Sequence, residues 1–388
     1  MIPNGAFIGT RTCQMIGRAG RVVILLAVFG NDMRASQVRA AQVAERVVGD
    51  SVTCSRCTIQ QTFVARVGAE SGPGHIIALP SAMTEDSRGR FWLSQGSEPL
   101  CVFGRDGRFE RCVGKRGRGV GEFASPSGIF SASGDSMVVV DAGVPRVSVL
   151  SADGAVGRTL DISEQMFGGV VVRWPGSVYL SGANHGVSAV GWPIHQVSFA
   201  GDHLETINSF GPDNGKLLPG GEGSSTLRLA LSRTGTLWSV DMTQYRLAEF
   251  KPDGTKLRIL RRNPAWFSGT STAWIGNPTT PPPPQAIAVR EDESGYLWVF
   301  VRTASPTWRD GWSKVKPGTT EVGFGDISLD KMFRTTIEII DPSAGAVVAR
   351  RALDLWVVGA IRGGRVVTYK VDASGPRLDV IQLKLERR

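Results

Sequence analysis

The residues with the most evident chemical potential lie between Gly114 and Phe130, where glycines and basic side chains alternate in GKRGRGVGEFASPSGIF. Glycines at such spacing could cradle a phosphate, and arginine with glycine could bind RNA. The phosphate interpretation fails because G-x-G-x-G ends at Glu122 and no helical period follows. RNA binding would need aromatic side chains between the basic residues, and the glycine-rich part offers only Phe123. We therefore expect a structural connector.

Four cysteines have spacings that could matter. Cys54 and Cys57 form C-S-R-C, with no following histidine for haem and no second C-x-x-C for zinc. A local disulfide is the ordinary interpretation, and metal or redox chemistry is the alternative. Cys101 and Cys112 flank an Asp-Gly turn and would face each other across a hairpin. They form either a cross-strand disulfide or two separate buried thiols.

Histidine-based chemistry has little support in the sequence. Two of the four histidines, His185 and His195, lie ten residues apart without a third ligand nearby. We find no recognisable Ser-His-Asp set and no G-x-S-x-G elbow. We therefore assign no catalytic residue and no cofactor, and we leave open whether a divalent metal binds.

The elements that would position these residues are β-strands. The chain has 388 residues, of which 41% are hydrophobic, 20% are charged and 48 are glycine, which suits a core with many turns. Six times a glycine and a short spacer precede an apolar β run. These runs begin at Gly89, Gly134, Gly176, Gly235, Gly295 and Gly364. A period of about 40–50 residues with insertions indicates an array of β units.

Each copy lies within a unit of four strands, as in residues 127–162, and several units contain Asp-Gly turns typical of hairpins. The fold class predicted over 59–388 is all-β, a six-bladed β-propeller of four-stranded antiparallel blades. The last unit supplies only three strands. Residues 59–68 belong to no other blade, and we predict that they pair with 376–385 and close the ring.

Residues 114–154 combine a glycine-rich segment, Gly-Glu-Phe, a proline, Val-x-Asp, Arg-Val and Asp-Gly. This segment resembles an NHL-type repeat, and 59–388 resembles bacterial six-bladed propellers of that kind, many of them exported and uncharacterised. The resemblance is close in the second unit, partial in the first and fourth, and architectural elsewhere. It implies a fold more strongly than a function. Some six-bladed propellers are calcium-dependent lactonases or zinc-dependent lyases, with metal ligands on the axis.

The first 40 residues have the pattern of an export signal. Basic residues precede the apolar run 22–29, which is too short to span a bilayer, and small residues stand before Ala41. We expect a signal peptide over 1–40, a linker with C-x-x-C over 41–58, and a periplasmic or secreted product without stable membrane insertion. Five arginines and one aspartate in 1–40 contribute much of the net charge of +9, so the remainder is only mildly basic.

Two recurring patterns are predicted to be structural. The spacing D-x4-R joins Asp141 to Arg146 and Asp241 to Arg246, and we expect the carboxylate to anchor the loop between the second and third strands and to pair with the arginine. Large aromatic residues also recur in the second strand, where they should pack between blades. These are Trp92, Trp238 and Trp298.

The long insertions are the strongest functional signal. In a four-stranded blade the b–c and d–a connections emerge on one face, and all four insertions are of these kinds. They are 183–194, 211–226, 263–284 and 303–334. Long loops on a rigid scaffold commonly carry function. They hold five candidate ligand-binding residues, Trp192, Trp266, Trp274, Trp308 and Trp312.

Two arrangements of these loops remain open. A binding face should leave several of the rings part-exposed around a concavity, whereas a packed lid should bury them. The first function hypothesis is an exported, monomeric, non-enzymatic scaffold that binds a protein, peptide or glycan, and not nucleic acid. The alternative is a calcium- or zinc-dependent propeller hydrolase, lactonase or lyase.

Overall fold

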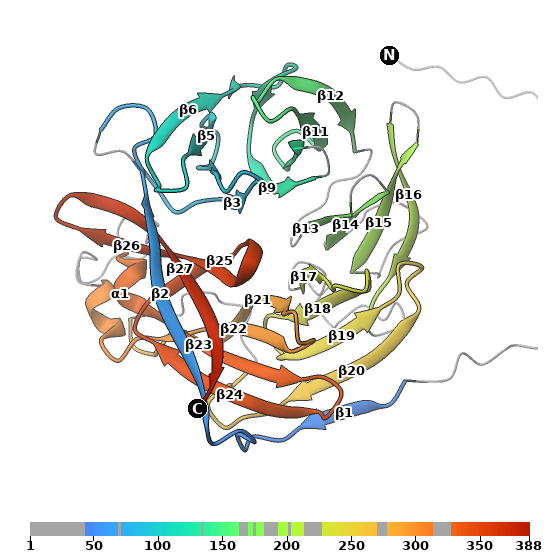
Figure 1. Ribbon diagram of the computed structural model, residues 1–388, viewed down its shortest axis with the longest axis vertical. Helices are drawn as coiled ribbons and strands as arrows, with labels where there is room; N and C mark the ends of the chain where they lie inside the picture. Colours follow the sequence, from blue (N-terminus) through green and yellow to red (C-terminus); the bar gives the residue numbers. More distant parts are fainter. Residues whose placement is uncertain are drawn as a thin grey trace, which may run out of the picture. The chain divides into compact units, whose positions relative to one another are not determined.

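The computed structural model describes residues 43–68, 71–132, 135–162, 170–173, 176–181, 193–200, 203–212, 227–269, 278–312 and 327–388. The expected signal segment therefore lies outside the described residues. Within Val43–Arg388, six sheets surround a common centre, with each first strand innermost (Figure 1). The chain is the predicted six-bladed β-propeller.

The first three blades follow one another along the chain, and each is an antiparallel sheet in sequence order. Blade 1 contains β3 (Ala82–Glu85), β4 (Phe91–Ser94), β5 (Leu100–Phe103) and β6 (Phe109–Val113). Blade 2 contains β9 (Pro126–Ser131), β10 (Met137–Asp141), β11 (Arg146–Leu150) and β12 (Val156–Asp161). Blade 3 contains β13 (Val170–Arg173), β14 (Ser177–Ser181), β15 (Ile194–Ala200) and β16 (His203–Phe210).

The remaining blades have longer strands on average, and blades 4 and 6 each receive a strand from the N-terminal region. Blade 4 contains β17 (Leu227–Leu231), β18 (Leu237–Asp241), β19 (Arg246–Phe250) and β20 (Lys256–Arg262). Blade 5 contains β21 (Gln285–Glu291), β22 (Leu297–Ala304), β23 (Phe333–Asp341) and β24 (Ala346–Leu353). Blade 6 contains β25 (Trp356–Ala360), β26 (Arg365–Asp372), β27 (Gly375–Arg387) and, outermost, β2 (Cys57–Val67).

Ring closure by the N-terminal strand is confirmed. Strand β2 pairs antiparallel with β27, with Gln61 opposite Leu383 and Val67 opposite Leu378. The apolar residues Ile59 and Leu383 are both buried in the core between blades 5 and 6. The first described long strand thus completes the last blade.

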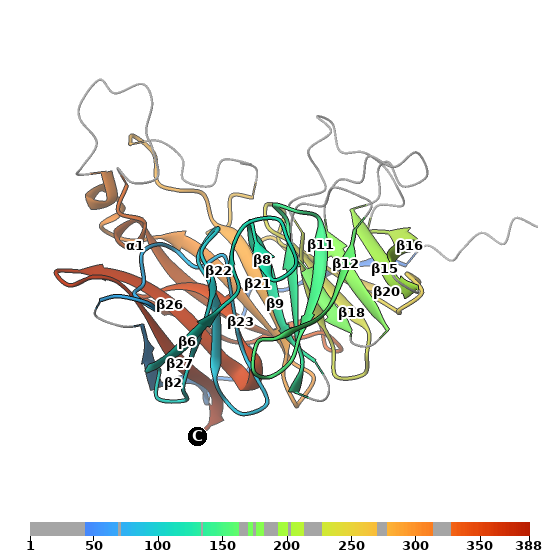
Figure 2. The ribbon, with the colours of Figure 1, turned by 90° about the horizontal axis from the view of Figure 1, so that it is seen from above.

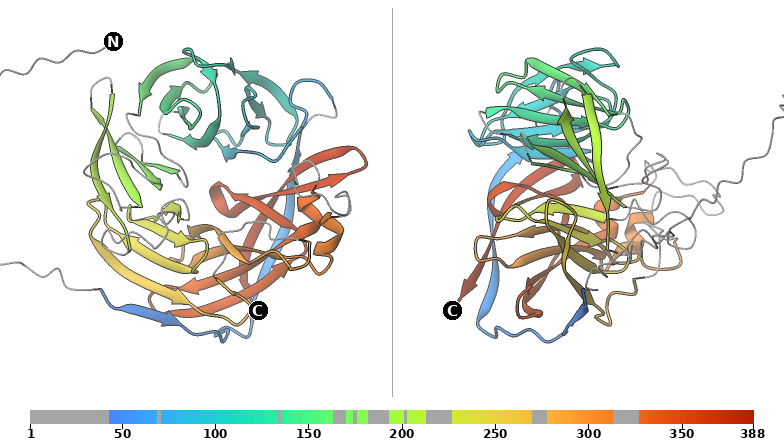
Figure 3. Two further views of the ribbon diagram at one scale, coloured as in Figure 1. Left: turned by 180° about the vertical axis from the view of Figure 1, so that it is seen from behind. Right: turned by 90° about the vertical axis from the view of Figure 1, so that its right-hand side faces the viewer.

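The expected linker over 41–58 is structured in its described part. Strand β1 (Glu45–Val48) pairs parallel with β20 as a fifth strand on blade 4, and Val52 then bridges Val347 at the edge of blade 5. Residues 45–67, here called the N-terminal strap, therefore contact blades 4, 5 and 6 in succession (Figure 3). The outer strands β20 and β24 have edge backbone groups to pair, and Glu45 forms an ion pair with Arg246 at 2.8 Å.

The recurring tryptophans pack between blades as predicted. Trp92, Trp238 and Trp298 are almost fully buried. Trp92 donates a hydrogen bond from Nε1 to Asp86 at 3.0 Å, in the a–b turn of its own blade. Blade 4 has a serine at the corresponding turn position, and Trp238 donates instead to Glu291 of blade 5 at 3.3 Å.

The glycine-rich connector folds back on itself between blades 1 and 2. Strand β7 (Lys115–Arg116) pairs parallel with β8 (Glu122–Phe123), and Lys115 forms an ion pair with Glu122 at 3.1 Å. A glycine is needed at Gly114, where φ is +74° and a Cβ would stand 2.4 Å from the ring of buried Phe123. The connector is built as a closed structural turn.

Candidate ligand-binding site

The described parts of two insertions, 263–269 with 278–284 and 303–312 with 327–334, leave the ring on the same side (Figure 2). The second begins with the short 3-10 helix η2 (Trp308–Trp312) and ends with α1 (Leu329–Met332). The side chains of Trp308 and Trp312 are only 6% and 8% exposed. They pack in one hydrophobic cluster with Met332, with Phe333 and, from blade 6, with Trp356.

The exposure expected of Trp308 and Trp312 at a binding face is therefore not observed. The b–c insertion of blade 5 closes over its neighbour and needs its own apolar core, which these two rings supply. Trp192 and Trp274 lie outside the described residues. Among the five candidates, Trp266 is the one described ring that is part-exposed.

Trp266 lines a cavity of about 580 Å³ on the insertion-bearing face, between the blade 4–5 link and the ends of three strands of blade 5. We call it the Trp266 cavity. One wall is the proline run 281–284, and the opposite side is formed by Thr303, Thr336 and three arginines. The arginines are Arg334, Arg350 and Arg351. The volume suits a small molecule or the end of a peptide.

The Trp266 ring is held from below by aromatic contacts. Its centroid lies 6.2 Å from that of Tyr245 and 6.0 Å from that of Phe267, both edge-on. The guanidinium of Arg350 lies 5.8 Å from the Trp266 ring centroid, in range for a cation–π contact. The ring is therefore fixed in place before any ligand arrives.

Two residues of the lining also carry a buried N–H without a hydrogen-bond acceptor among the described residues. They are Trp266, through Nε1, and Arg334, through Nε. Both atoms are covered by protein, and orphaned donors of this kind also occur away from the cavity, at Arg146 and Trp312. They therefore do not by themselves mark a ligand-binding site.

Beneath the cavity, a buried charge network joins blade 4, blade 5 and the N-terminal strap. Glu338 is fully buried and accepts hydrogen bonds from Arg262 at 2.7 and 3.0 Å and from Arg350 at 2.7 Å. Arg262 also donates to Asp50 of the strap at 2.9 Å. This hydrogen bond from Arg262 lowers the pKa of Asp50. Burial, followed by the charge of Glu338, raises the pKa of the Tyr245 hydroxyl, which donates to Glu338.

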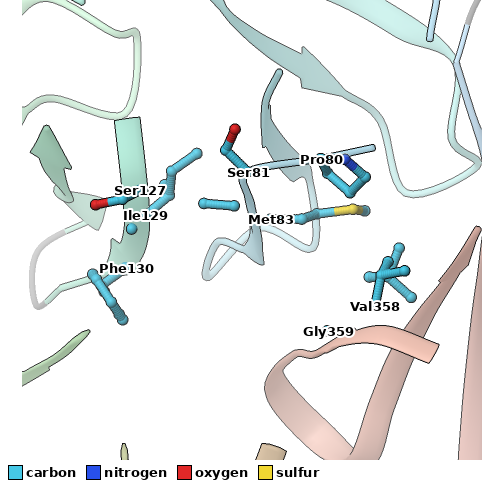
Figure 4. Close-up of a pocket in the computed structure, with 11 residues that line it drawn as sticks. Pro80, Ser81, Met83, Ser127, Ile129, Phe130, Val358 and Gly359 are labelled. Atoms are coloured by element: carbon cyan, nitrogen blue, oxygen red, sulfur yellow. The ribbon is translucent and has the colours of Figure 1, made fainter. Parts of the chain in front are cut away.

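A second, smaller cavity of about 190 Å³ lies on the axis between β3, β9 and β25 (Figure 4). Apolar side chains such as Met83, Ile129 and Val358 line it, together with the hydroxyls of Ser81 and Ser127. The described lining includes no histidine or carboxylate. Throughout the described residues, no group of three or more His, Cys, Asp or Glu side chains could hold a metal ion.

The D-x4-R residues act on loops. Asp141 accepts hydrogen bonds from the backbone N–H groups of Ala124 and Ser125 at 2.8 Å, and Arg146 lies 4.0 Å away. Asp241 accepts from the N–H and hydroxyl of Thr243. Arg246 differs from the expectation, since its ion pair is with Glu45 of the strap, which covers this edge only in blade 4.

Both proposed cysteine pairs are disulfides in the structure. Cys54 and Cys57 are joined within the strap, and Cys101 is joined to Cys112 directly opposite on β5 and β6. Of the two histidines that lie ten residues apart in the sequence, His185 lies outside the described residues. His195 is buried within blade 3, where its Nδ1 lies 2.9 Å from the Ser209 hydroxyl.

No protein-family model matches the chain, and no curated protein matches it. Several solved structures share its fold. A member of the DUF4221 family from Bacteroides vulgatus aligns with a TM-score of 0.55 at 11% identity, over 85% of this chain and 99% of that one. A putative exported protein from Bacteroides fragilis aligns with a TM-score of 0.52 at 9% identity, over 88% and 99%. A streptogramin B lyase structure aligns with a TM-score of 0.44 at 12% identity, over 84% and 98%.

At such identities the likeness concerns the propeller fold alone, and the sites must be judged from this chain's own residues. Sequence reasoning identified the insertion-bearing face and Trp266, but not Arg334 or Glu338. Arg334 stands near the start of β23, and nothing in its sequence neighbourhood distinguishes it from a basic loop residue. Among the described residues, no helix of this propeller has the length and apolar character needed to cross a membrane.

Proposed function

We propose that the protein is an exported, non-enzymatic six-bladed propeller that binds a protein, peptide or glycan through its insertion-bearing face. The recognition site in this proposal is the Trp266 cavity. The observation that carries the proposal is the cavity itself, preformed on the insertion-bearing face and lined by the part-exposed Trp266, a proline run and three arginines.

The chemistry of the lining supports binding over catalysis. The described residues around the Trp266 cavity are Trp, Pro, Ser, Thr, Ala and Arg, without a carboxylate, histidine, cysteine or lysine among them. General acid–base catalysis near neutral pH commonly relies on those types, since arginine keeps its proton. The lining can orient a ligand but has no evident group to transfer its protons.

Export is supported by three independent features. The two disulfides suit an oxidising compartment, and residues 1–40 have the pattern of a signal peptide. A protein of similar fold is described as a putative exported protein. We also propose that residues 114–154 form an NHL-type repeat.

The test is a binding screen of the purified protein against panels of glycans and short peptides, followed by two variants. Trp266→Ala should weaken any captured ligand at least tenfold, because it removes both the ring and its N–H. Trp308→Ala, in the lid core, should lower the melting temperature but retain binding in the folded protein. Wild-type affinity in Trp266→Ala would show that the ligand binds elsewhere.

A further inference from the structure

The charge of the Trp266 cavity limits what can bind there. Among the described residues, three arginines and no aspartate or glutamate line it. Arg350 is compensated from below, because its Nε donates to Glu338 at 2.7 Å and its Nη2 also contacts Asp50. Arg351 donates to the backbone carbonyl of Ile59, which satisfies a donor but leaves the positive charge.

Arg334 is the most distinctive of these arginines. Its nearest carboxylate, that of Asp354, lies 3.9 Å from Nη1, and the Asp354 side chain is 90% exposed. Exposed pairs at this distance contribute little. The Arg334 side chain is 35% exposed and lines the cavity. A guanidinium edge presents two parallel N–H groups, which match the two oxygens of a carboxylate.

The rest of the lining specifies the body of the ligand. The prolines at 281–284 present apolar ring carbons and no backbone N–H, and Ala304 and Ala352 add apolar surface. Trp266 adds a flat ring and one donor. A neutral sugar presents many hydroxyl donors, and this lining offers them only a few hydroxyl acceptors. An apolar body that ends in one anionic acceptor group fits better.

We propose that the Trp266 cavity binds a carboxylate attached to an apolar body, either the C-terminus of a peptide or a small apolar acid. This inference rests on the proposed function and names its ligand class. The guanidinium of Arg334 pairs with the carboxylate, and the proline wall and the Trp266 ring pack against the body. Arg351 contributes positive potential without a direct ion pair.

The experiment uses two matched pairs of probes. One pair is phenylbutyrate and phenylbutanamide, and the other is an N-acetylated hydrophobic tripeptide with a free C-terminal carboxylate and the same tripeptide as its C-terminal amide. Dissociation constants are measured by ligand-observed NMR up to 10 mM. We expect at least one acid to bind ten times more tightly than its amide, and the tighter acid identifies the source of the carboxylate.

Variants then locate the carboxylate. Arg334→Gln should reduce the acid to the affinity of the amide, and Arg334→Lys should recover only part of it, because lysine keeps the charge but lacks the two-donor edge. The matched control is Arg309→Gln, whose guanidinium lies over the Trp308 ring rather than at the cavity. It should leave the preference for acid unchanged.

Three outcomes would overturn the inference. Equal binding of acid and amide that Trp266→Ala abolishes would reject the carboxylate but keep the cavity as the binding site. Equal binding that Trp266→Ala leaves intact would reject both the inference and the proposed function. Absence of binding by every probe to the wild-type protein would reject the carboxylate inference. The proposed binding function would then be tested separately by the glycan and peptide panels.

Discussion

The connector between blades 1 and 2 and the connector between blades 4 and 5 perform the same task with opposite chemistry. Both join an outermost strand to the next innermost strand on the same face. In the first, Glu122 accepts the Gly119 N–H and pairs with Lys115, and Asp141 accepts further N–H groups. In the second, Trp266 and the proline run 281–284 form part of the lining of a cavity that also includes three arginines.

The difference shows where sequence chemistry can mislead. The glycine-rich connector has the residues of a nucleotide or RNA site, yet many of its polar groups form hydrogen bonds or ion pairs within the protein. The proline-rich connector has no motif, yet it walls the Trp266 cavity. A preformed cavity is a better guide to a functional site than polar residues in the sequence.

The strongest test of the closed connector is Asp141→Ala. It removes the acceptor of several backbone N–H groups and leaves the buried Arg146 without its nearby carboxylate. We expect a loss of about 3–5 kcal/mol in the free energy of unfolding, measured by urea denaturation. Binding at the Trp266 cavity should persist in the protein that remains folded. A loss below about 1 kcal/mol would mean that the connector is not anchored by this carboxylate.

A somewhat smaller effect is expected for Trp308→Ala. Its ring belongs to the lid core with Met332 and Trp356, and removal of a buried aromatic ring costs about 3–5 kcal/mol in a rigid core and less where a short lid can relax. We therefore expect about 2–3 kcal/mol by calorimetry or urea denaturation. The comparison variant Trp266→Phe should cost less than about 1 kcal/mol, because it retains most of the packing. Equal losses would erase the distinction between lid and cavity.

A modest pH effect is expected at the strap. The pKa of Asp50 is lowered by its hydrogen bond from Arg262, so its contribution to stability is present above its unfolded pKa of about 3.8 and is lost as the pH falls through the lower folded value. Because Asp50 is half-exposed, the effect should be small. Asp50→Asn should flatten the dependence of the melting temperature between about pH 2 and 4. An unchanged slope would contradict the assignment.

The smallest effect is expected from Arg116→Ser combined with Arg118→Ser. Arg116 is exposed, and the connector uses the backbone carbonyl rather than the side chain of Arg118 to bind Arg146. The melting temperature should change by less than about 1 °C, and neither ligand binding nor weak RNA binding in a filter assay should change specifically. A selective loss of RNA binding would restore the connector as a functional site.

The fold could be predicted because its signals are local. Glycine before each second strand and Asp-Gly in several hairpins mark the units, and counting strands showed that the last unit needed residues 59–68. The pairing of β1 with β20 was missed. Four residues, Glu45–Val48, carry no pattern that distinguishes an added edge strand from a linker.

The site could be predicted only in part. The placement of insertions on one face follows from blade geometry, and it led to Trp266. The burial of Trp308 and Trp312 depends on Trp356 of the next blade, which no local pattern connects to them. The network of Glu338 with Arg262 likewise joins residues 76 positions apart, and only the folded ring brings them together.

The closure of blade 6 has a kinetic consequence. Its outer ladder joins residues such as Arg66 and Asp379, which are 313 positions apart, so closing it early would incur the full loop entropy of the ring. We therefore expect local hairpins to form first and the β2–β27 ladder to form late. Interactions that form after the transition state mainly affect the rate of unfolding. We accordingly expect the opening of this ladder, together with the part of the strap on blades 4 and 5, to influence how long the folded ring persists.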